Sequence, residues 1–288
     1  MTSSANSYSV LMSVYHKVPP EQLALSLASL AWQTRPADQI VIVMDGPIPD
    51  PLRHQLDAFQ SRHRGTELVP LKQNVGLSRA LNAGIEFCRG DWLIRMDADD
   101  LSLPNRFAQQ IAYIEAHPEV DVLGTALYEF SDNYRQPERI KPVITNHVDI
   151  AASIGLRNPI NHPTVCLRKQ RLLDAGGYPE LNLLEDYYLW GKLLQAGATF
   201  HNLAEPLYLF RFDAGTLVRR RGLDNFKNET WLRQWLHKQG LIPGYTRFIA
   251  NTLQLLLRFA PGTVQNWLWQ RSRQSCDISL QLPELPEP

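Results

Sequence analysis

The chain has 288 residues, 44% of them hydrophobic, and its 29 basic and 29 acidic side chains cancel to a formal net charge of zero. This composition excludes a largely disordered chain, with irregular structure expected only at residues 1–7 and 281–288. No basic segment is followed by a long apolar run, which argues against a signal peptide or a membrane-spanning helix. The three widely spaced cysteines, Cys88, Cys166 and Cys276, fit a cytoplasmic protein in which the first two are buried.

Strand-like and helix-like segments alternate through the first half of the chain. The β-branched run Gln39–Met44 ends at Asp-Gly, a turn signal, and predicts a strand. Leu23, Leu27 and Leu30 have the spacing of one helix face and predict a helix over Glu21–Trp32. The other elements predicted here are strands at Tyr8–Val14, Glu67–Leu71, Asp91–Met96 and Asp121–Tyr128, and helices at Leu52–His63 and Asn105–Ala116. Leu77, Leu81 and Ile85 also have the spacing of one helix face.

The second half of the chain is less regular. Thr164–Arg168 has the pattern of a strand and Glu185–Ala196 that of a helix, and from Asp224 onward the sequence predicts helices only. The expected division is an α/β domain at residues 1–223, a C-terminal helical extension at 224–280 and a flexible tail at 281–288.

Repeated β-α units predict an α/β fold with a mostly parallel sheet and helices on both faces. Ligands of such sheets bind beyond the carboxyl ends of the strands. Polar residues follow each of the first four predicted strands, among them Tyr15, Asp45, Asn74 and Asp97. We therefore expect the functional site at this edge of the sheet.

Three carboxylates, those of Asp97, Asp99 and Asp100, follow the fourth predicted strand. Like charges so close together repel one another, and a bound divalent cation removes the conflict. Hard oxygen ligands of this kind suit Mg²⁺ or Mn²⁺, which also bind substrate phosphates. The alternative is an acidic turn that caps the following helix near Ser102.

Glu185 and Asp186 are adjacent where the aromatic-rich helix is predicted to begin. The helix dipole favours carboxylates there, so an N-terminal cap is one interpretation. The other is a general base that removes the proton of an attacking hydroxyl group. Physical reasoning from the sequence does not separate the two acids; Asp186 is the candidate base, and Glu185 would orient nearby groups.

Several short motifs occur in an order that resembles the family 2 glycosyltransferases, which have the GT-A fold. Between about residues 8 and 213 they are Val14-Tyr15, Asp45-Gly46, Asn74-Val75-Gly76-Leu77, Ala80-Leu81-Asn82, Asp97-Ala98-Asp99-Asp100, His162-Pro163-Thr164, Gly176-Gly177-Tyr178 and Glu185-Asp186-Tyr187. The run from Arg95 to Phe107 is especially similar to bacterial exopolysaccharide enzymes of the amylovoran type.

The resemblance implies an inverting transfer of a sugar, most often from a UDP-sugar, to an acceptor hydroxyl in polysaccharide or glycolipid biosynthesis. It implies that Tyr15 lies against the nucleobase and that Asp45 accepts a bond from uracil. Asp97 would face the ribose or sugar, and Asp99 would hold the metal that bridges the diphosphate. Asp97 and Asp99 are thus the expected ligands of Mn²⁺ or Mg²⁺, and Asp186 is the expected base.

Asn74, Asn82 and Arg211 are further candidates for binding the nucleotide sugar, and each has a structural alternative. Asn74 can form an Asx-turn before Gly76. Asn82 is unfavourable inside a helix, which indicates a specific hydrogen bond that is either structural or catalytic. Arg211 either reaches the diphosphate or holds the last loop of the domain. For Arg106 a structural role is favoured over pairing with the acidic cluster.

The C-terminal region is basic, with eleven Lys and Arg but three acids between Pro206 and Ser275. Arg219, Arg220 and Arg221 suit the diphosphate of the donor or of a lipid-linked acceptor. Aromatic and basic residues farther along suit a helix on an anionic membrane surface, here the inner face of the cell membrane. The alternative is that the same apolar positions pack onto the first domain.

Two other functions share parts of this pattern. A sugar-nucleotide nucleotidyltransferase has the same α/β layout and metal-binding acids, but the region after the first strand lacks the Gly-rich loop that such enzymes usually carry. A non-catalytic binding module would keep the fold, whereas the chain retains Asp97, Asp99 and Asp186. Nucleic-acid binding is disfavoured because the basic residues form no recognised motif.

Overall fold

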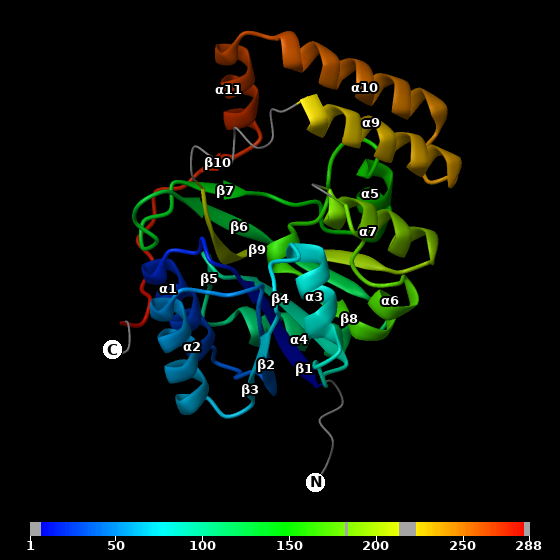
Figure 1. The fold of residues 1–288 in the computed structure, drawn as a ribbon. Helices are drawn as coiled ribbons and strands as arrows, with labels where there is room; N and C mark the ends of the chain where they lie inside the picture. The colour runs from blue at the N-terminus through cyan, green and yellow to red at the C-terminus, as the bar shows by residue number, and fades with distance from the viewer. Residues whose placement is uncertain (1–6, 182–183, 213–222, 285–288) are drawn as a thin grey trace.

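One sheet with helices on both sides makes up most of the computed structural model, which describes residues 7–181, 184–212 and 223–284 (Figure 1). The strands are β1 (Tyr8–Val14), β2 (Gln39–Met44), β3 (Thr66–Pro70), β4 (Trp92–Asp97), β5 (Leu101–Ser102), β6 (Val122–Phe130), β7 (Arg139–Lys141), β8 (Cys166–Arg168), β9 (Phe200–Arg211) and β10 (Gln274–Ser275). The helices are α1 (Pro20–Ala31), α2 (Asp50–Arg62), α3 (Leu77–Ile85), α4 (Arg106–Ala116), α5 (His147–Ser153), α6 (Lys169–Asp174), α7 (Glu185–Gln195), α9 (Leu223–Lys238), α10 (Gly244–Phe259) and α11 (Gly262–Arg271).

The strand order across the sheet is β10-β7-β6-β8-β4-β1-β2-β3, with β9 beside β6 and β5 beside β9. The long pairings are parallel: β1 with β2 and β4, β2 with β3, and β6 with β9. The short strands β5, β7, β8 and β10 pair antiparallel with their neighbours. The predicted α/β fold with a mostly parallel sheet is therefore confirmed.

The strands and helices predicted in the first half of the chain are also confirmed. The predicted bounds of β1 and β2 agree with the structure residue for residue, and Leu77, Leu81 and Ile85, which have helical spacing, all lie in α3. The other elements begin and end within about two residues of the prediction, as is usual where a boundary depends on capping geometry.

One predicted strand of the second half is shorter than expected. Of the segment Thr164–Arg168, only Cys166–Arg168 is a strand, because Thr164 ends a 3₁₀ turn, His162–Thr164. The Thr164 hydroxyl donates to the backbone carbonyl of Asn161 at 2.8 Å and so closes the turn. This local bond competes with strand pairing.

The chain beyond the last helix returns to the sheet. β10 pairs with β7, so the expectation of helices only from Asp224 onward is wrong. Arg273 holds this segment, because its Nε donates to the buried carboxylate of Glu129 at 2.8 Å. A two-residue strand is too short to show an alternating pattern in the sequence. Farther on, Leu282 packs against a small apolar cluster that contains Phe130.

The core has two main layers, one on each face of the sheet. Val10 and Leu11 are neighbours on β1 but belong to different apolar clusters, since successive side chains of a strand point to opposite faces. Phe107 of α4 joins the cluster of Val10. Cys88 and Cys166 are buried as predicted, one in each cluster.

Helix α9 packs on α7 and shares the core of the α/β domain. The ring of Trp235 lies 4.6 Å from that of Tyr188, and Leu232 and Leu236 are fully buried. Helix α10 lies on the outer side of α9, and Ala250 is its only buried residue among the 16 that the structure describes (Figure 1). In the described part of the chain, every helix is too short or too polar to span a membrane.

Candidate active site

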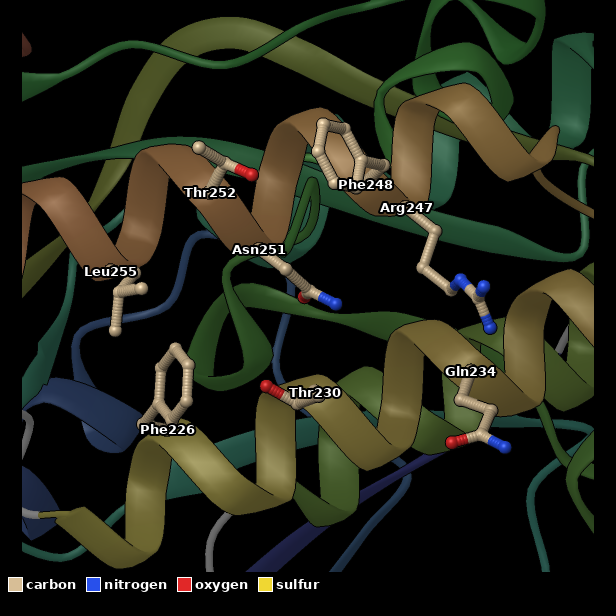
Figure 2. A pocket seen from close by; sticks show the side chains of 8 residues that line it. All are labelled: Phe226, Thr230, Gln234, Arg247, Phe248, Asn251, Thr252 and Leu255. Carbon is tan, nitrogen blue, oxygen red and sulfur yellow. The ribbon is translucent and has the colours of Figure 1, made fainter.

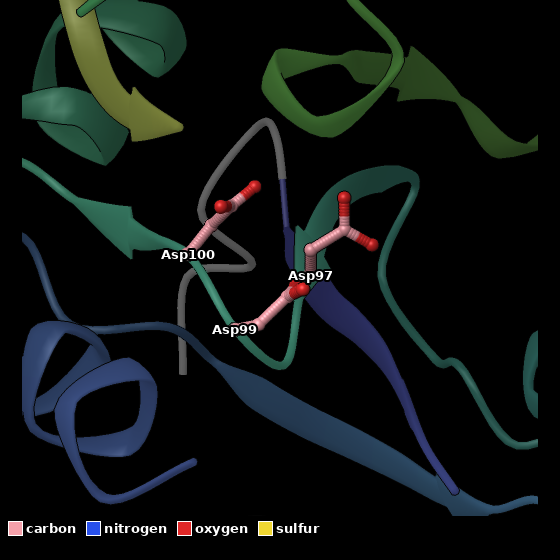
Figure 3. Close-up of side chains that lie close together, drawn as sticks. All are labelled: Asp97, Asp99 and Asp100. Atoms are coloured by element: carbon pink, nitrogen blue, oxygen red, sulfur yellow. The ribbon is translucent and has the colours of Figure 1, made fainter. Parts of the chain in front are cut away.

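The turn after β4 brings three carboxylates together (Figure 3). Asp97 is the last residue of β4, Asp99 is exposed and Asp100 is buried. One oxygen atom from each lies within 4.8 Å of the others. Three hard oxygen donors at this spacing fit a Mg²⁺ or Mn²⁺ ion.

Burial and mutual repulsion oppose the ionisation of these acids. Partial desolvation, and then the charge of Asp97, raises the pKa of Asp99 to about 6, although the residue as a whole is exposed. Burial raises the pKa of Asp100 well above its ordinary value, and the charge of Asp99 adds to the effect. A divalent cation at this turn would favour the ionised carboxylates.

A buried arginine lies directly beside the acidic turn. Arg95 and Asp97 are two residues apart on β4, so their side chains share one face of the strand, and they form an ion pair. Burial alone would lower the pKa of Arg95, but the charge of Asp97 raises it above its usual value. The charge of Arg95 also acts on Glu185 and Asp186. Arg95 is thus paired with one predicted group of acids, and its charge lowers the pKa of both acids of the other group.

Asp100 connects the end of β9 to the acidic turn. Its Oδ1 accepts a hydrogen bond from the backbone N–H of Arg211 at 2.7 Å, and the Nε of Arg211 donates to the backbone carbonyl of Asp99 at 3.1 Å. The guanidinium also lies over the ring of Phe130, 4.6 Å from its centroid. Arg211 is therefore adjacent to the predicted metal ligands.

Asp45 organises the loop that follows β3. Asp45 is 3% exposed, and its carboxylate accepts three bonds, from Asn74 Nδ2 at 3.0 Å, Val75 N–H at 2.7 Å and Gly76 N–H at 3.1 Å. Gly46 has φ +84°, and a Cβ there would lie 2.5 Å from the backbone nitrogen of Asn74. Asn74 thus supports Asp45 directly, and a uracil N–H would share oxygens that already accept bonds.

Tyr15 lies one residue beyond β1 and is 41% exposed. The N–H of Asp45 donates to the carbonyl of Val14 at 2.8 Å, so the ends of β1 and β2 are adjacent. The exposed ring of Tyr15 and the carboxylate of Asp45 therefore border the same edge of the sheet, as predicted for parallel strands.

Asn82 makes the specific hydrogen bonds that its position in a helix indicated. Its Nδ2 donates to the carbonyl of Tyr178 at 2.8 Å, and its Oδ1 accepts from the N–H of Tyr178 at 2.8 Å. The amide therefore fixes the backbone of Tyr178, which favours the structural alternative for Asn82.

Glu185 and Asp186 form the first turn of α7, as predicted. The preceding residue, Leu184, has φ +76°, a rare conformation for a residue other than glycine. Asp186 accepts hydrogen bonds from Asn158 Nδ2 and from the backbone N–H of Tyr187, both at 2.7 Å. Burial raises the pKa of Asp186, and burial with the charge of Asp186 raises that of Glu185 to about 7.

A cavity of about 410 Å³ connects this turn to the loop after β3. It is lined by Val75, Gly76, Leu77, Ser78, Arg79, Glu180, Leu181 and Glu185. Glu185 therefore faces a space that also borders the backbone supported by Asp45.

Arg106 has the structural role that the sequence favoured. It is fully buried and donates to the carbonyls of Arg95 at 2.9 Å and Pro163 at 3.1 Å, and to the hydroxyl of Ser102 at 2.8 Å. Burial lowers its pKa to about 10. These bonds hold β4, the segment before β8 and the start of α4 in place behind the acidic turn.

Replacing Glu185 by glutamine tests whether burial raises the pKa of its carboxyl group. With a pKa raised from 4.5 to about 7, folded Glu185 stays protonated over a pH range in which the unfolded chain has lost that proton. Stability should therefore fall as the pH rises through this window. We expect the melting temperature of Glu185→Gln to match that of the unaltered chain near pH 4.5 and to exceed it by at least about 2 °C at pH 8, in metal-free buffer.

The exposed residue Glu205, for which the same substitution removes no buried charge, provides a control. Glu205→Gln should track the unaltered chain at both pH values. If the difference in melting temperature between Glu185→Gln and the unaltered chain were the same at pH 4.5 and pH 8, the raised pKa of Glu185 would be contradicted.

Comparison with known proteins reveals a family relationship. Residues 9–177 match the family model described as glycosyl transferase family 2. Over 273 residues the chain is 37% identical to the amylovoran biosynthesis glycosyltransferase AmsE of Erwinia amylovora, covering 93% of this chain and 99% of that protein. It is 30% identical over 272 residues to the UDP-Gal:alpha-D-GlcNAc-diphosphoundecaprenol beta-1,3-galactosyltransferase of Escherichia coli, covering 94% and 98%.

A solved structure shows the same architecture. S. aureus TarS 1–349 in complex with UDP-GlcNAc superposes with a TM-score of 0.61 at 20% identity, covering 78% of this chain and 65% of that chain. At this identity the likeness shows the fold alone. The fold and the match over residues 9–177 confirm the predicted resemblance. The chain belongs to glycosyl transferase family 2 and is a glycosyltransferase with a GT-A fold.

Proposed function

We propose that this enzyme transfers a sugar from a UDP-sugar to an acceptor hydroxyl group, with inversion at the anomeric carbon and with the help of a divalent cation. The proposal rests mainly on Arg95, which pairs with Asp97 and whose charge also acts on Glu185 and Asp186. Asp97 and Asp99 then suit the diphosphate end of the donor, and Glu185 and Asp186 suit the attacking hydroxyl group. The UDP-GlcNAc complex of TarS supports a UDP donor.

On the donor side, Asp97 and Asp99 would hold the cation, with Asp97 also facing the ribose or sugar. Bound there, Mn²⁺ or Mg²⁺ supplies a Lewis acid that neutralises the charge developing on the departing UDP. Arg211, whose Nε bonds to the carbonyl of Asp99, would add a second positive charge near the same phosphates.

The nucleobase would bind at the edge formed by the ends of β1 and β2. In this proposal the exposed ring of Tyr15 lies against uracil and Asp45 accepts one of its N–H groups. Asn74 contributes by holding the carboxylate of Asp45 in position. Asn82 contributes indirectly, because it fixes the backbone of Tyr178.

Asp186 would take the proton from the attacking hydroxyl. The bond from Asn158 orients its carboxylate, and the raised pKa makes the ionised form a stronger base. Glu185 lines the adjacent cavity and would orient the acceptor. A single displacement on the side opposite UDP inverts the configuration of the sugar.

The acceptor in this proposal is a saccharide or a lipid-linked saccharide of polysaccharide or glycolipid biosynthesis. Two relatives support it: one is named for amylovoran biosynthesis, and the other acts on a sugar carried by diphosphoundecaprenol. A lipid-linked acceptor would bring the cytoplasmic enzyme into peripheral contact with the inner face of the cell membrane.

Incubating the purified chain with a panel of UDP-sugars and Mn²⁺ tests the proposed reaction. We expect slow release of UDP from at least one donor, faster release when a saccharide acceptor is present, and loss of both with EDTA. Release of pyrophosphate would instead indicate a nucleotidyltransferase. Absence of turnover with every donor and acceptor would indicate a binding module and contradict the proposal.

A further inference from the structure

Helix α10 exposes its apolar side. Five large apolar residues lie along one stripe of the helix, with exposed fractions between 47% and 81%: Tyr245, Phe248, Ile249, Leu256 and Phe259. A surface helix of a globular protein normally turns such a stripe towards the core. Large exposed apolar patches generally mark an interaction site.

The polar side of α10 faces the protein instead. Arg233 of α9 is 4% exposed and donates to Asn251 at 3.1 Å and to Gln254 at 2.6 Å, both on α10. It also pairs with Glu229 of its own helix at 2.7 Å. Figure 2 shows Asn251 directed towards α9, and Phe248, at the rim of the pocket between the two helices, is 72% exposed. These contacts around the buried Arg233 fix the orientation of α10, and its apolar stripe therefore faces outwards.

The segment around the stripe has no acidic residue and one exposed cation. Residues 239–276 contain four arginines and neither Asp nor Glu. Arg273 is paired with Glu129 and Arg258 lies over the ring of Phe226 on α9, whereas Arg271 is exposed. The next helix, α11, adds Trp267, which is half exposed and whose ring centroid lies 4.6 Å from the guanidinium carbon of Arg271. Aromatic residues with flanking cations are typical of helices that lie at the level of lipid headgroups.

We propose that α10 lies on an anionic lipid bilayer, with Phe248 and Phe259 inserted below the headgroups and the exposed Arg271 of α11 near the lipid phosphates. A second copy of the chain fits this face less well. Two-fold pairing would bring the same acid-free segments together, and no acid between residues 239 and 276 would offset the repulsion between the exposed Arg271 side chains. The inference deepens the proposed function, since a lipid-linked acceptor lies in such a bilayer, but its test does not require sugar transfer.

Co-sedimentation of the full chain with vesicles tests the proposal. We expect the chain to bind phosphatidylglycerol-containing vesicles, with weaker binding to pure phosphatidylcholine and at high salt. The double variant Phe248→Ser and Phe259→Ser should lose at least about tenfold in partitioning, because two large apolar side chains no longer leave water. Both residues are exposed, so the variant should keep its melting temperature and its affinity for UDP.

Phe87→Ser is the matched control, because Phe87 is an exposed phenylalanine far from α10 in the sequence, and it should bind vesicles like the unaltered chain. Three results would overturn the proposal: no binding of the unaltered chain to anionic vesicles, equal binding by the double variant, or a dimer in solution that the double variant abolishes. If every variant and the unaltered chain failed to bind UDP, that result would count against the proposed function and would leave the proposed membrane contact unaffected.

Discussion

Replacing Asp99 by alanine is expected to weaken the binding of UDP in manganese buffer by at least about tenfold and to lower the rate of sugar transfer by about 100-fold or more. The reason is that in the proposed mechanism Asp99 is one of two carboxylates that would hold the cation between protein and diphosphate. Titration calorimetry with UDP and a coupled assay of UDP release measure the two effects. The fold should persist, since the substitution removes a carboxylate that Asp97 repels.

Asp57→Ala is the control for this variant. Asp57 is an exposed aspartate of α2 that pairs with Arg53, and its removal should leave UDP binding and transfer unchanged. Equal affinity for UDP in the Asp99→Ala variant and the unaltered chain, in the presence of manganese, would rule out the metal site at this turn.

Replacing Asp186 by asparagine should lower kcat by about 100- to 10,000-fold and leave the KM for the donor nearly unchanged. Asparagine has the same shape and can still accept the bond from Asn158 through its Oδ1, but it cannot take a proton. Steady-state kinetics with varied donor and acceptor separate the two parameters. UDP affinity should be retained, because the proposed contacts of the nucleotide lie at Tyr15 and Asp45.

Two further variants distinguish the roles of neighbouring residues. Asn158→Ala should reduce kcat less than Asp186→Asn and should shift the acidic limb of the pH profile to higher pH, because the bond from Asn158 lowers the pKa of Asp186.

Glu185→Gln should raise the KM for the acceptor more than it lowers kcat. Full kcat in Asp186→Asn together with loss of kcat in Glu185→Gln would assign the base to Glu185 instead.

The strands that could be predicted are those with continuous apolar runs and clear turn signals. β1 and β2 are examples, since both are almost completely buried between layers of helices. β9 was missed because Pro206 and two register shifts against β6 interrupt its pattern. β5 and β10 have two residues each, and tertiary pairing rather than local sequence defines them.

The groups of candidate site residues could be predicted where their members are neighbours in the sequence. Asp97 and Asp99 lie in one turn, and Glu185 and Asp186 in another, so both groups are visible in the sequence. Arg95 also left a signal, because a charged residue stands inside an apolar strand two positions before an acid.

The contacts that hold the site come from distant parts of the chain and left no such signal. Asn158 is 28 residues from Asp186, and Asn82 is 96 residues from Tyr178. Arg219, Arg220 and Arg221, which were expected to meet a diphosphate, lie outside the described residues.

The position of β8 has a consequence for biosynthesis on the ribosome. β8 lies between β4 and β6 although it follows both in the chain, and Cys166 pairs with Ile94 on one side and Leu123 on the other. The emerging polypeptide therefore completes β1 to β6 as two unjoined parts, each with an open strand edge that can associate with other chains. A fragment that stops before Cys166 is thus an incomplete sheet rather than a smaller enzyme, and we expect it to aggregate more readily than the chain that includes this short central strand.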